Sequence, residues 1–155
     1  MRSKHLICLM ILTAGLLSTA CTPQQGYSRF EHIPSTDWEK ADTIDFLIPP
    51  VAESGTYQEA LHLRINTSFP FQSLTVEVIE TVYPENSRKR YVRNCPLIDK
   101  NGNIKGAGVS LFQYTYPLGD IQLNRGDSVR IAVTHCMARE IMNGVTDVGI
   151  SLTKR

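Results

Sequence analysis

The chain has 155 residues, of which 42% are hydrophobic, and its 16 Lys and Arg residues nearly balance its 15 Asp and Glu residues, for a formal net charge of +1. This composition is typical of a globular protein and excludes a disordered, collagen-like or polytopic membrane chain. The near-neutral charge also argues against a nucleic-acid partner.

Residues 1–20 have the composition of an export signal rather than of a folded domain. Arg2 and Lys4 form a basic start, and residues 6–17 are an apolar stretch. This stretch is too short to span a bilayer and has the length of the hydrophobic region of a secretory signal. A transmembrane anchor is therefore disfavoured. Removing the segment with its two basic residues leaves 14 basic against 15 acidic residues, a net charge of −1.

Residues 17–21, Leu-Ser-Thr-Ala-Cys, resemble the lipobox of a bacterial lipoprotein. In that motif the signal is removed before the Cys, and the Cys then carries fatty acyl chains such as palmitate. Ser18 stands where the usual Leu is found, and Leu17 lies one position further back. The resemblance implies a membrane anchor at Cys21, to which each buried methylene contributes about 0.8 kcal/mol. The alternative is a soluble secreted protein cleaved after Ala20.

The chain after the signal is predicted to form a tether and one domain. Residues 21–29 would be the lipidated tether, because residues 22–29 contain Pro, Gly and polar groups without an apolar period. Residues 30–155 have the length of a single domain and contain no internal repeats.

Strands dominate the predicted domain. Apolar and polar residues alternate with the period of two that indicates a strand with one buried face, and Gly, Pro and Asn clusters separate the candidate strands. About seven to eight strands of this kind imply an all-β fold, a single antiparallel β-sandwich of jelly-roll or Ig-like topology. The candidates are residues 43–48, 61–65, 74–78, 88–98, 109–116, 129–133 and 145–153.

Two local predictions follow from turn chemistry. Asn101-Gly102 favours a tight hairpin turn, so residues 88–98 are expected to pair with the strand that starts at Val109. Residues 137–142 form the one segment that could close a helical turn, which Gly144 would end.

His135 is the most informative histidine. It shares the alternation phase of the apolar residues at 129–133, so its side chain is expected to be buried, with Asp147 or Asp99 as a candidate hydrogen-bond partner. The histidines lack metal-ligand spacing, so we predict no metal site and no cofactor. A hydrolase that uses His135 and Asp147 is a weak third hypothesis, because no nucleophile motif accompanies the pair.

Cys95 and Cys136 are a candidate disulfide, since an exported compartment permits one. The bond would close a loop of about 42 residues and contribute about 4 kcal/mol. The alternative is two free thiols, with Cys136 packed at a strand end. Neither residue has an adjacent general base that would indicate a nucleophile.

Two other features have simple structural interpretations. Gly102, Gly106 and Gly108 are expected at turns and bulges, because a strand rather than a helix follows them. The basic run 88–90 with Arg93 is expected to be a solvated edge that discourages aggregation, or alternatively a contact for anionic lipid or an acidic partner.

Aromatic residues leave two interpretations open. Phe112, Tyr114 and Tyr116 share one face of a strand and, with Trp38, would usually belong to the core. If they were exposed, they would favour a carbohydrate-binding module. Residues 69–71, Phe-Pro-Phe, are expected to form a packed corner, or a docking knob if exposed.

Several segments together carry a family resemblance over nearly the whole mature chain: Cys21, Trp38, Asp42-Thr-Ile-Asp-Phe46, Leu63-Arg64, Phe69-Pro70-Phe71, residues 99–108, residues 134–137 and Gly144-Val-Thr-Asp-Val-Gly-Ile150. They resemble the GldH family of gliding-motility lipoproteins from the Bacteroidetes. No catalytic residues carry over, and Cys95 and Cys136 are not part of the family pattern.

The resemblance implies a lipid-anchored, non-enzymatic cell-envelope protein that supports a gliding-motility or associated secretion apparatus through contacts with other envelope proteins. Residues 22–25 lack the acidic run associated with surface export in this bacterial group, which favours the periplasmic face of the outer membrane. The alternative from another class is a carbohydrate-binding β-sandwich at the envelope.

Overall fold

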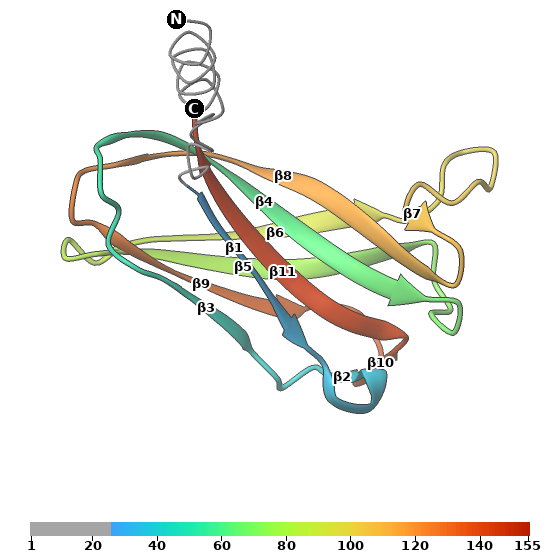
Figure 1. The fold of residues 1–155 in the computed structure, drawn as a ribbon. Helices are drawn as coiled ribbons and strands as arrows, with labels where there is room; N and C mark the ends of the chain where they lie inside the picture. The colour runs from blue at the N-terminus through green and yellow to red at the C-terminus, as the bar shows by residue number, and fades with distance from the viewer. Residues whose placement is uncertain (1–25) are drawn as a thin grey trace, which may run out of the picture.

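The computed structural model describes residues 26–155, which form two packed antiparallel sheets (Figure 1). One sheet has the strand order β1-β11-β4-β8-β7 and the other β3-β9-β5-β6, and β2 and β10 form a separate two-stranded ribbon. The strands are β1 (Gly26–His32), β2 (Asp37–Glu39), β3 (Ile44–Ile48), β4 (Gly55–Asn66), β5 (Ser73–Tyr83), β6 (Ser87–Pro96), β7 (Ala107–Gly108), β8 (Leu111–Leu123), β9 (Ser128–His135), β10 (Ile141–Asn143) and β11 (Val145–Lys154), with a 3-10 turn at Pro34–Thr36.

This arrangement confirms the predicted β-sandwich, and its strand order is that of a jelly roll. All seven predicted strands are present, as β3, β4, β5, β6, β8, β9 and β11. With β1 they make eight long strands whose chain order places the first, eighth, third and sixth in one sheet and the second, seventh, fourth and fifth in the other. The short strands β2, β7 and β10 were not predicted.

The core lies between the two sheets and is formed by the alternation visible in the sequence. Leu61 and Leu63 of β4 and Leu74 and Val76 of β5 belong to one core cluster, and all four side chains are fully buried. Burial of each such side chain contributes about 1.5–3 kcal/mol. The apolar period of two therefore determines which face of each sheet points inward.

The predicted hairpin across Asn101-Gly102 is wrong. β6 pairs with β5 across the turn at residues 84–86, whereas β8 pairs with β4 in the opposite sheet. Asn101-Gly102 closes only a small turn with one isolated bridge between Ile98 and Ile104. Turn chemistry is local, and the pairing of long strands is decided by which faces they bury.

The predicted helical turn at residues 137–142 is also wrong. Residues 141–143 form β10, which pairs with β2 so that Met142 lies opposite Trp38, and both side chains are buried. A segment this short gains too little from helical hydrogen bonds to form a helix without packing. Gly144 does end the segment, with a φ of 90° in the turn that leads into β11.

The sandwich has two distinct ends. The tether end contains Gly26, where β1 begins, and the loops 49–54, 84–86 and 124–127. Two of these loops are joined by backbone hydrogen bonds from Val51 N to Asp127 O and from Gly126 N to Val51 O. The far end contains the loops 67–72, 97–110 and 136–140. Residues 26–29 were predicted as tether but belong to β1, which pairs with β11.

Two further observations concern the membrane. Cys21 and the predicted signal lie outside the described residues. Within residues 26–155, no helix is long and apolar enough to cross a bilayer.

Candidate functional site

His135 is buried at the end of β9 and has a structural environment. Its Nε2 lies 3.1 Å from the backbone oxygen of Trp38, its Nδ1 lies 3.4 Å from the backbone nitrogen of Met137, and its ring meets the Trp38 indole edge-on at 5.3 Å. Burial lowers the pKa of His135, so the imidazole is neutral. It donates through Nε2 to Trp38 and ties the β2–β10 ribbon to the sandwich.

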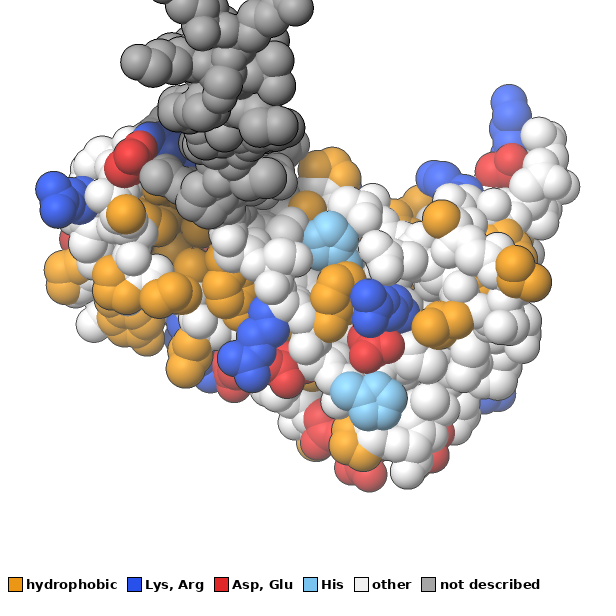
Figure 2. Space-filling model, viewed as in Figure 1, with side chains coloured by type: hydrophobic (Ala, Val, Ile, Leu, Met, Phe, Trp, Pro, Cys, Tyr) orange, Lys and Arg blue, Asp and Glu red, His pale blue; other side chains and the backbone are white. Residues whose placement is uncertain are grey.

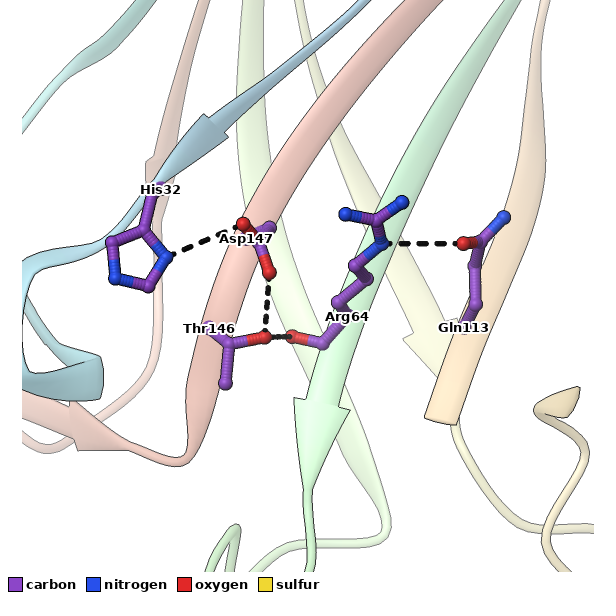
Figure 3. A network of polar contacts seen from close by, with 5 residues as sticks. All are labelled: His32, Arg64, Gln113, Thr146 and Asp147. Atoms are coloured by element: carbon purple, nitrogen blue, oxygen red, sulfur yellow. Dashed lines mark hydrogen bonds and ion pairs between the residues drawn. The ribbon is translucent and has the colours of Figure 1, made fainter. Parts of the chain in front are cut away.

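Neither predicted partner contacts His135. Asp99 instead accepts bonds from the backbone nitrogens of Asn101 and Asn103 in its own loop, at 2.8 and 2.9 Å. Asp147 is half-buried on the outer face of the five-stranded sheet, where Oδ1 lies 3.3 Å from Nδ1 of His32 (Figure 3). The expectation that Asp147 or Asp99 is the hydrogen-bond partner of His135 is therefore wrong.

Asp147 belongs to a polar row across four strands, from His32 through Thr146 and Arg64 to Gln113 (Figure 3). The Thr146 hydroxyl lies 2.8 Å from Asp147 and 3.0 Å from the Arg64 carbonyl, and donates to one of them at a time. In a nucleophilic triad the imidazole stands between acid and hydroxyl. Here the acid stands between them, so the row does not have the order of a nucleophilic triad.

The two mature-domain cysteines are free thiols in the structure. Cys95 lies opposite Leu74 on one side of β5, and the backbone nitrogen of Cys136 donates to Thr75 on the other side. With β5 between them the two residues are about 9–10 Å apart, two strand spacings, which exceeds the reach of a disulfide. Cys95 is buried and Cys136 is exposed, so the geometry favours the alternative of two free thiols.

The basic run lies on β6, the edge of the four-stranded sheet, with residues 88–90 exposed. Arg90 pairs with Glu77 on the neighbouring strand at 2.6 Å. Edge strands with cationic side chains discourage pairing with other chains, which agrees with the structural interpretation.

The predicted aromatic row is mostly inside the protein. Trp38, Tyr114 and Tyr116 are buried, and Phe112 is half-buried. Tyr116 donates to the backbone oxygen of Pro96 at 2.8 Å, which joins β8 to β6 across the open side of the sandwich. These four residues therefore offer no exposed aromatic platform for a sugar.

An apolar groove at the far end is the clearest candidate for binding. It has a volume of about 200 Å³ and lies where the loops 67–72 and 97–110 meet the end of the core; its lining is Ile65, Asn66, Thr67, Phe69, Phe71, Leu97, Ile98, Ile104, Phe112 and Tyr114. We call it the far-end groove. Phe69 packs against the core and against Phe71, whose ring is partly exposed, so the Phe-Pro-Phe segment is both a corner and part of the groove.

Exposed apolar side chains occur in the groove lining, at Ile104, and where the loop 97–110 enters β8, at Val109 and Leu111. Val109 is 92% exposed and Ile104 is 49% exposed, and Leu111 is also exposed. Two glycines hold their loop against β8, because a Cβ on Gly106 would lie 2.6 Å from the Tyr114 ring and one on Gly108 would lie 1.9 Å from the Leu111 carbonyl. Exposed apolar groups gathered around a groove mark a contact site for another apolar surface.

A buried carboxyl pair was missed by the sequence predictions. Glu59 of β4 and Glu80 of β5 are 2% and 6% exposed and meet between the sheets. Burial, together with the charge of Glu80 and a hydrogen bond with it, raises the pKa of Glu59 to about 8. Within the described residues, one oxygen of each carboxyl group and the hydroxyl of Tyr91 lack hydrogen-bond partners.

The signal for this pair is present in the alternation. Glu59 has the same phase as the buried Tyr57 and Leu61, and Glu80 has the phase of Val76 and Val78. Extending each predicted strand by one period would have placed both acids inward. Among residues 26–155 no group of three or more His, Cys, Asp or Glu side chains is arranged to hold a metal ion.

Comparison with solved structures finds similar β-rich domains at low sequence identity. One is Eiger TNF from S. frugiperda, with 11% identity and a TM-score of 0.44 over 84% of this chain and 91% of that one. Another is the Podospora anserina GH26-CBM35 β-(1,4)-mannanase, with 14% identity and a TM-score of 0.46 over 85% of this chain and 28% of that one. A family 35 carbohydrate-binding module from Clostridium thermocellum matches with 11% identity and a TM-score of 0.41 over 83% of this chain and 92% of that one.

Comparison with known sequences is more specific. The gliding motility lipoprotein GldH of Flavobacterium johnsoniae is 24% identical over 154 residues, which cover 94% of this chain and 95% of the relative. The model of the GldH lipoprotein family matches residues 25–152, nearly the whole described domain. This chain therefore belongs to the GldH lipoprotein family.

Proposed function

We propose that this protein is a non-enzymatic component of the cell envelope that supports a gliding-motility or associated secretion apparatus by contacting another envelope protein. In this proposal Cys21 is acylated, the tether is short, and the domain faces the periplasm from the outer membrane. Membership in a family of gliding-motility lipoproteins supports the anchor and the setting.

The observation that carries the contact mechanism is the far-end groove. It lies at the end of the sandwich opposite Gly26, so an anchor attached through Gly26 leaves the groove free for a partner. The exposed Ile104 of its lining, together with the exposed Val109 and Leu111 at the end of the same loop, fits an apolar segment of another protein, because burying such side chains supplies most of the binding energy of a protein interface.

Site-specific crosslinking in cells tests this proposal. A photoreactive residue at Val109 should give one discrete crosslinked product, while the same residue at Val92, which is exposed on β6, should give none above background. Equal yields of the same products from both positions would contradict a specific contact at the far end. Mass spectrometry of the Val109 product then identifies the partner.

A further inference from the structure

The tether end of the sandwich carries its own apolar surface. A pocket of about 290 Å³ opens between the ends of β1, β3, β4 and β11, and its walls include Tyr27, Ile48, Pro50, Val51 and Leu152. Leu47, 69% exposed, precedes Ile48 on β3 and lies on the outer face of its sheet, in a separate hollow with Tyr83 and Arg130. Pro49 and Ala52 of the pocket lining are also exposed. Figure 2 shows hydrophobic side chains gathered over this end of the molecule, on the left of the view.

Three ion pairs lie at or near this end, while Glu85 and Arg125 of its loops are exposed. Lys154 pairs with Glu53, and the guanidinium of Arg130 lies 2.7 Å from Asp45. Arg155 lies 3.1 Å from Asp120. Paired charges cost less to move into a region of lower polarity than isolated ones. The exposed charges here include both signs and the pocket lining carries none, so the partner should be recognised by apolar contact.

The length of the tether determines what this surface faces. Four residues lie between Cys21 and Gly26, which makes five steps along the chain. An extended chain spans at most about 3.6 Å per step, so Gly26 lies within about 18 Å of the acylated residue. The headgroup region of one leaflet takes up about 5–7 Å of that distance. An anchored domain must therefore keep its tether end next to the lipid headgroups.

We propose that the tether end rests on the bilayer that holds the Cys21 anchor, with Leu47 and the loop 49–52 in the interfacial region of the lipid. This inference rests on the lipid anchor of the proposed function and adds a fixed orientation to it. Apolar side chains at the boundary of headgroups and acyl chains gain binding energy in proportion to the apolar area they bury. The far-end groove then points away from the membrane.

Fluorescence quenching by brominated lipid tests the inference. The mature acylated protein is reconstituted into phosphatidylethanolamine and phosphatidylcholine vesicles with or without bromine on the acyl chains. Two variants, Leu47→Trp and Val109→Trp, each add one indole at an exposed position, and the buried Trp38 gives the same background in both. We expect bromine to reduce the emission of the Leu47→Trp indole at least twofold and to leave that of Val109→Trp unchanged.

Each alternative has its own outcome. If the protein fails to float with the vesicles, the lipid anchor of the proposed function is wrong, and the orientation falls with it. If it floats but bromine has equal effects at both positions, the orientation alone is overturned. If the emission of the Leu47→Trp indole shows that it is shielded from water to the same degree in brominated and plain vesicles, a second copy of the chain covers the surface. That outcome also overturns the inference.

A charge substitution provides a second measurement. Pro50→Asp, added to Leu47→Trp, should lower the bromine effect at least twofold, because a carboxylate opposes entry into the interface. The matched control Val92→Asp introduces the same charge on β6 and should leave the effect unchanged. Equal effects of the two charges would contradict a contact at the tether end.

Discussion

Glu59 and Glu80 are the residues whose chemistry is least like that of an ordinary sandwich core. Burial of Glu59, the charge of Glu80 and a hydrogen bond with Glu80 all favour the protonated form of Glu59. Lys89, which lies opposite Glu80 on β6, lowers the pKa of Glu59 but does not outweigh these effects. Tyr91 also faces the pair, and burial with the two nearby carboxyl groups raises its pKa.

The pair predicts a loss of stability at alkaline pH. The folded-state pKa of Glu59 is about 8, well above its ordinary value of 4.5, so its contribution is complete below pH 4.5 and is lost as the pH rises through 8. The free energy of unfolding should fall by at most about 1.4 kcal/mol per pH unit in this window. Urea unfolding of Glu59→Gln should show a flatter profile between pH 5 and 9, while the exposed control Glu85→Gln should follow the unmodified protein. Parallel profiles for all three would contradict a shared proton.

Cys95 and Cys136 differ in their exposure to solvent. Burial raises the pKa of Cys95 to about 12, so its thiolate is scarce as well as inaccessible, whereas Cys136 is exposed. In the native, acylated protein a thiol reagent should modify Cys136 and leave Cys95 unmodified, and guanidinium should release the second thiol. Peptide mapping identifies the modified residue. A disulfide would show no free thiol before reduction.

At the scale of elements, the β2–β10 ribbon depends on its contact with β9. The Trp38 carbonyl accepts a bond from His135, and the Trp38 indole donates to Asp42 O at 3.1 Å, so one aromatic residue is held from two sides. Ribbons of two strands are marginally stable alone. The ribbon is therefore kept in place by tertiary contacts more than by its own hydrogen bonds.

Replacement of His135 should accordingly be costly. His135→Ala leaves the Trp38 carbonyl without the imidazole donor, which should lower the free energy of unfolding by about 1–3 kcal/mol. It also removes the edge contact with the indole ring. Urea unfolding should show this loss, while His32→Ala, which breaks an exposed pair with Asp147, should cost less than about 1 kcal/mol. Similar costs for the two variants would mean that the ribbon does not depend on His135.

At the scale of the whole molecule, we propose a different binding partner for each end of the sandwich. The tether end faces the membrane in our proposal, and the far end presents its groove to a partner. β4, β8 and β11 run from one end to the other, so a rigid sheet separates the two contacts.

If Cys21 anchors the protein to the membrane, replacing this residue should change the location of the protein in the cell. Cys21→Ala removes the acylation site, so the protein should move from the membrane fraction to the soluble periplasmic fraction, as fractionation would show. Its domain should stay folded, because residues 26–155 form the described core. Val92→Ala, at an exposed site on β6, is the matched control and should stay in the membrane. A Cys21→Ala protein that stays in the membrane would refute the lipid anchor.

By itself the sequence determined the class of fold and the seven long strands, because a period of two in apolar residues depends only on which face of a strand is buried. It also placed His135 inward for the same reason. The tertiary structure decided the pairing of β6 with β5, the separation of Cys95 from Cys136 and the meeting of Glu59 with Glu80. These are contacts between segments distant in the chain, and local turn chemistry contains no information about which faces will meet across a core.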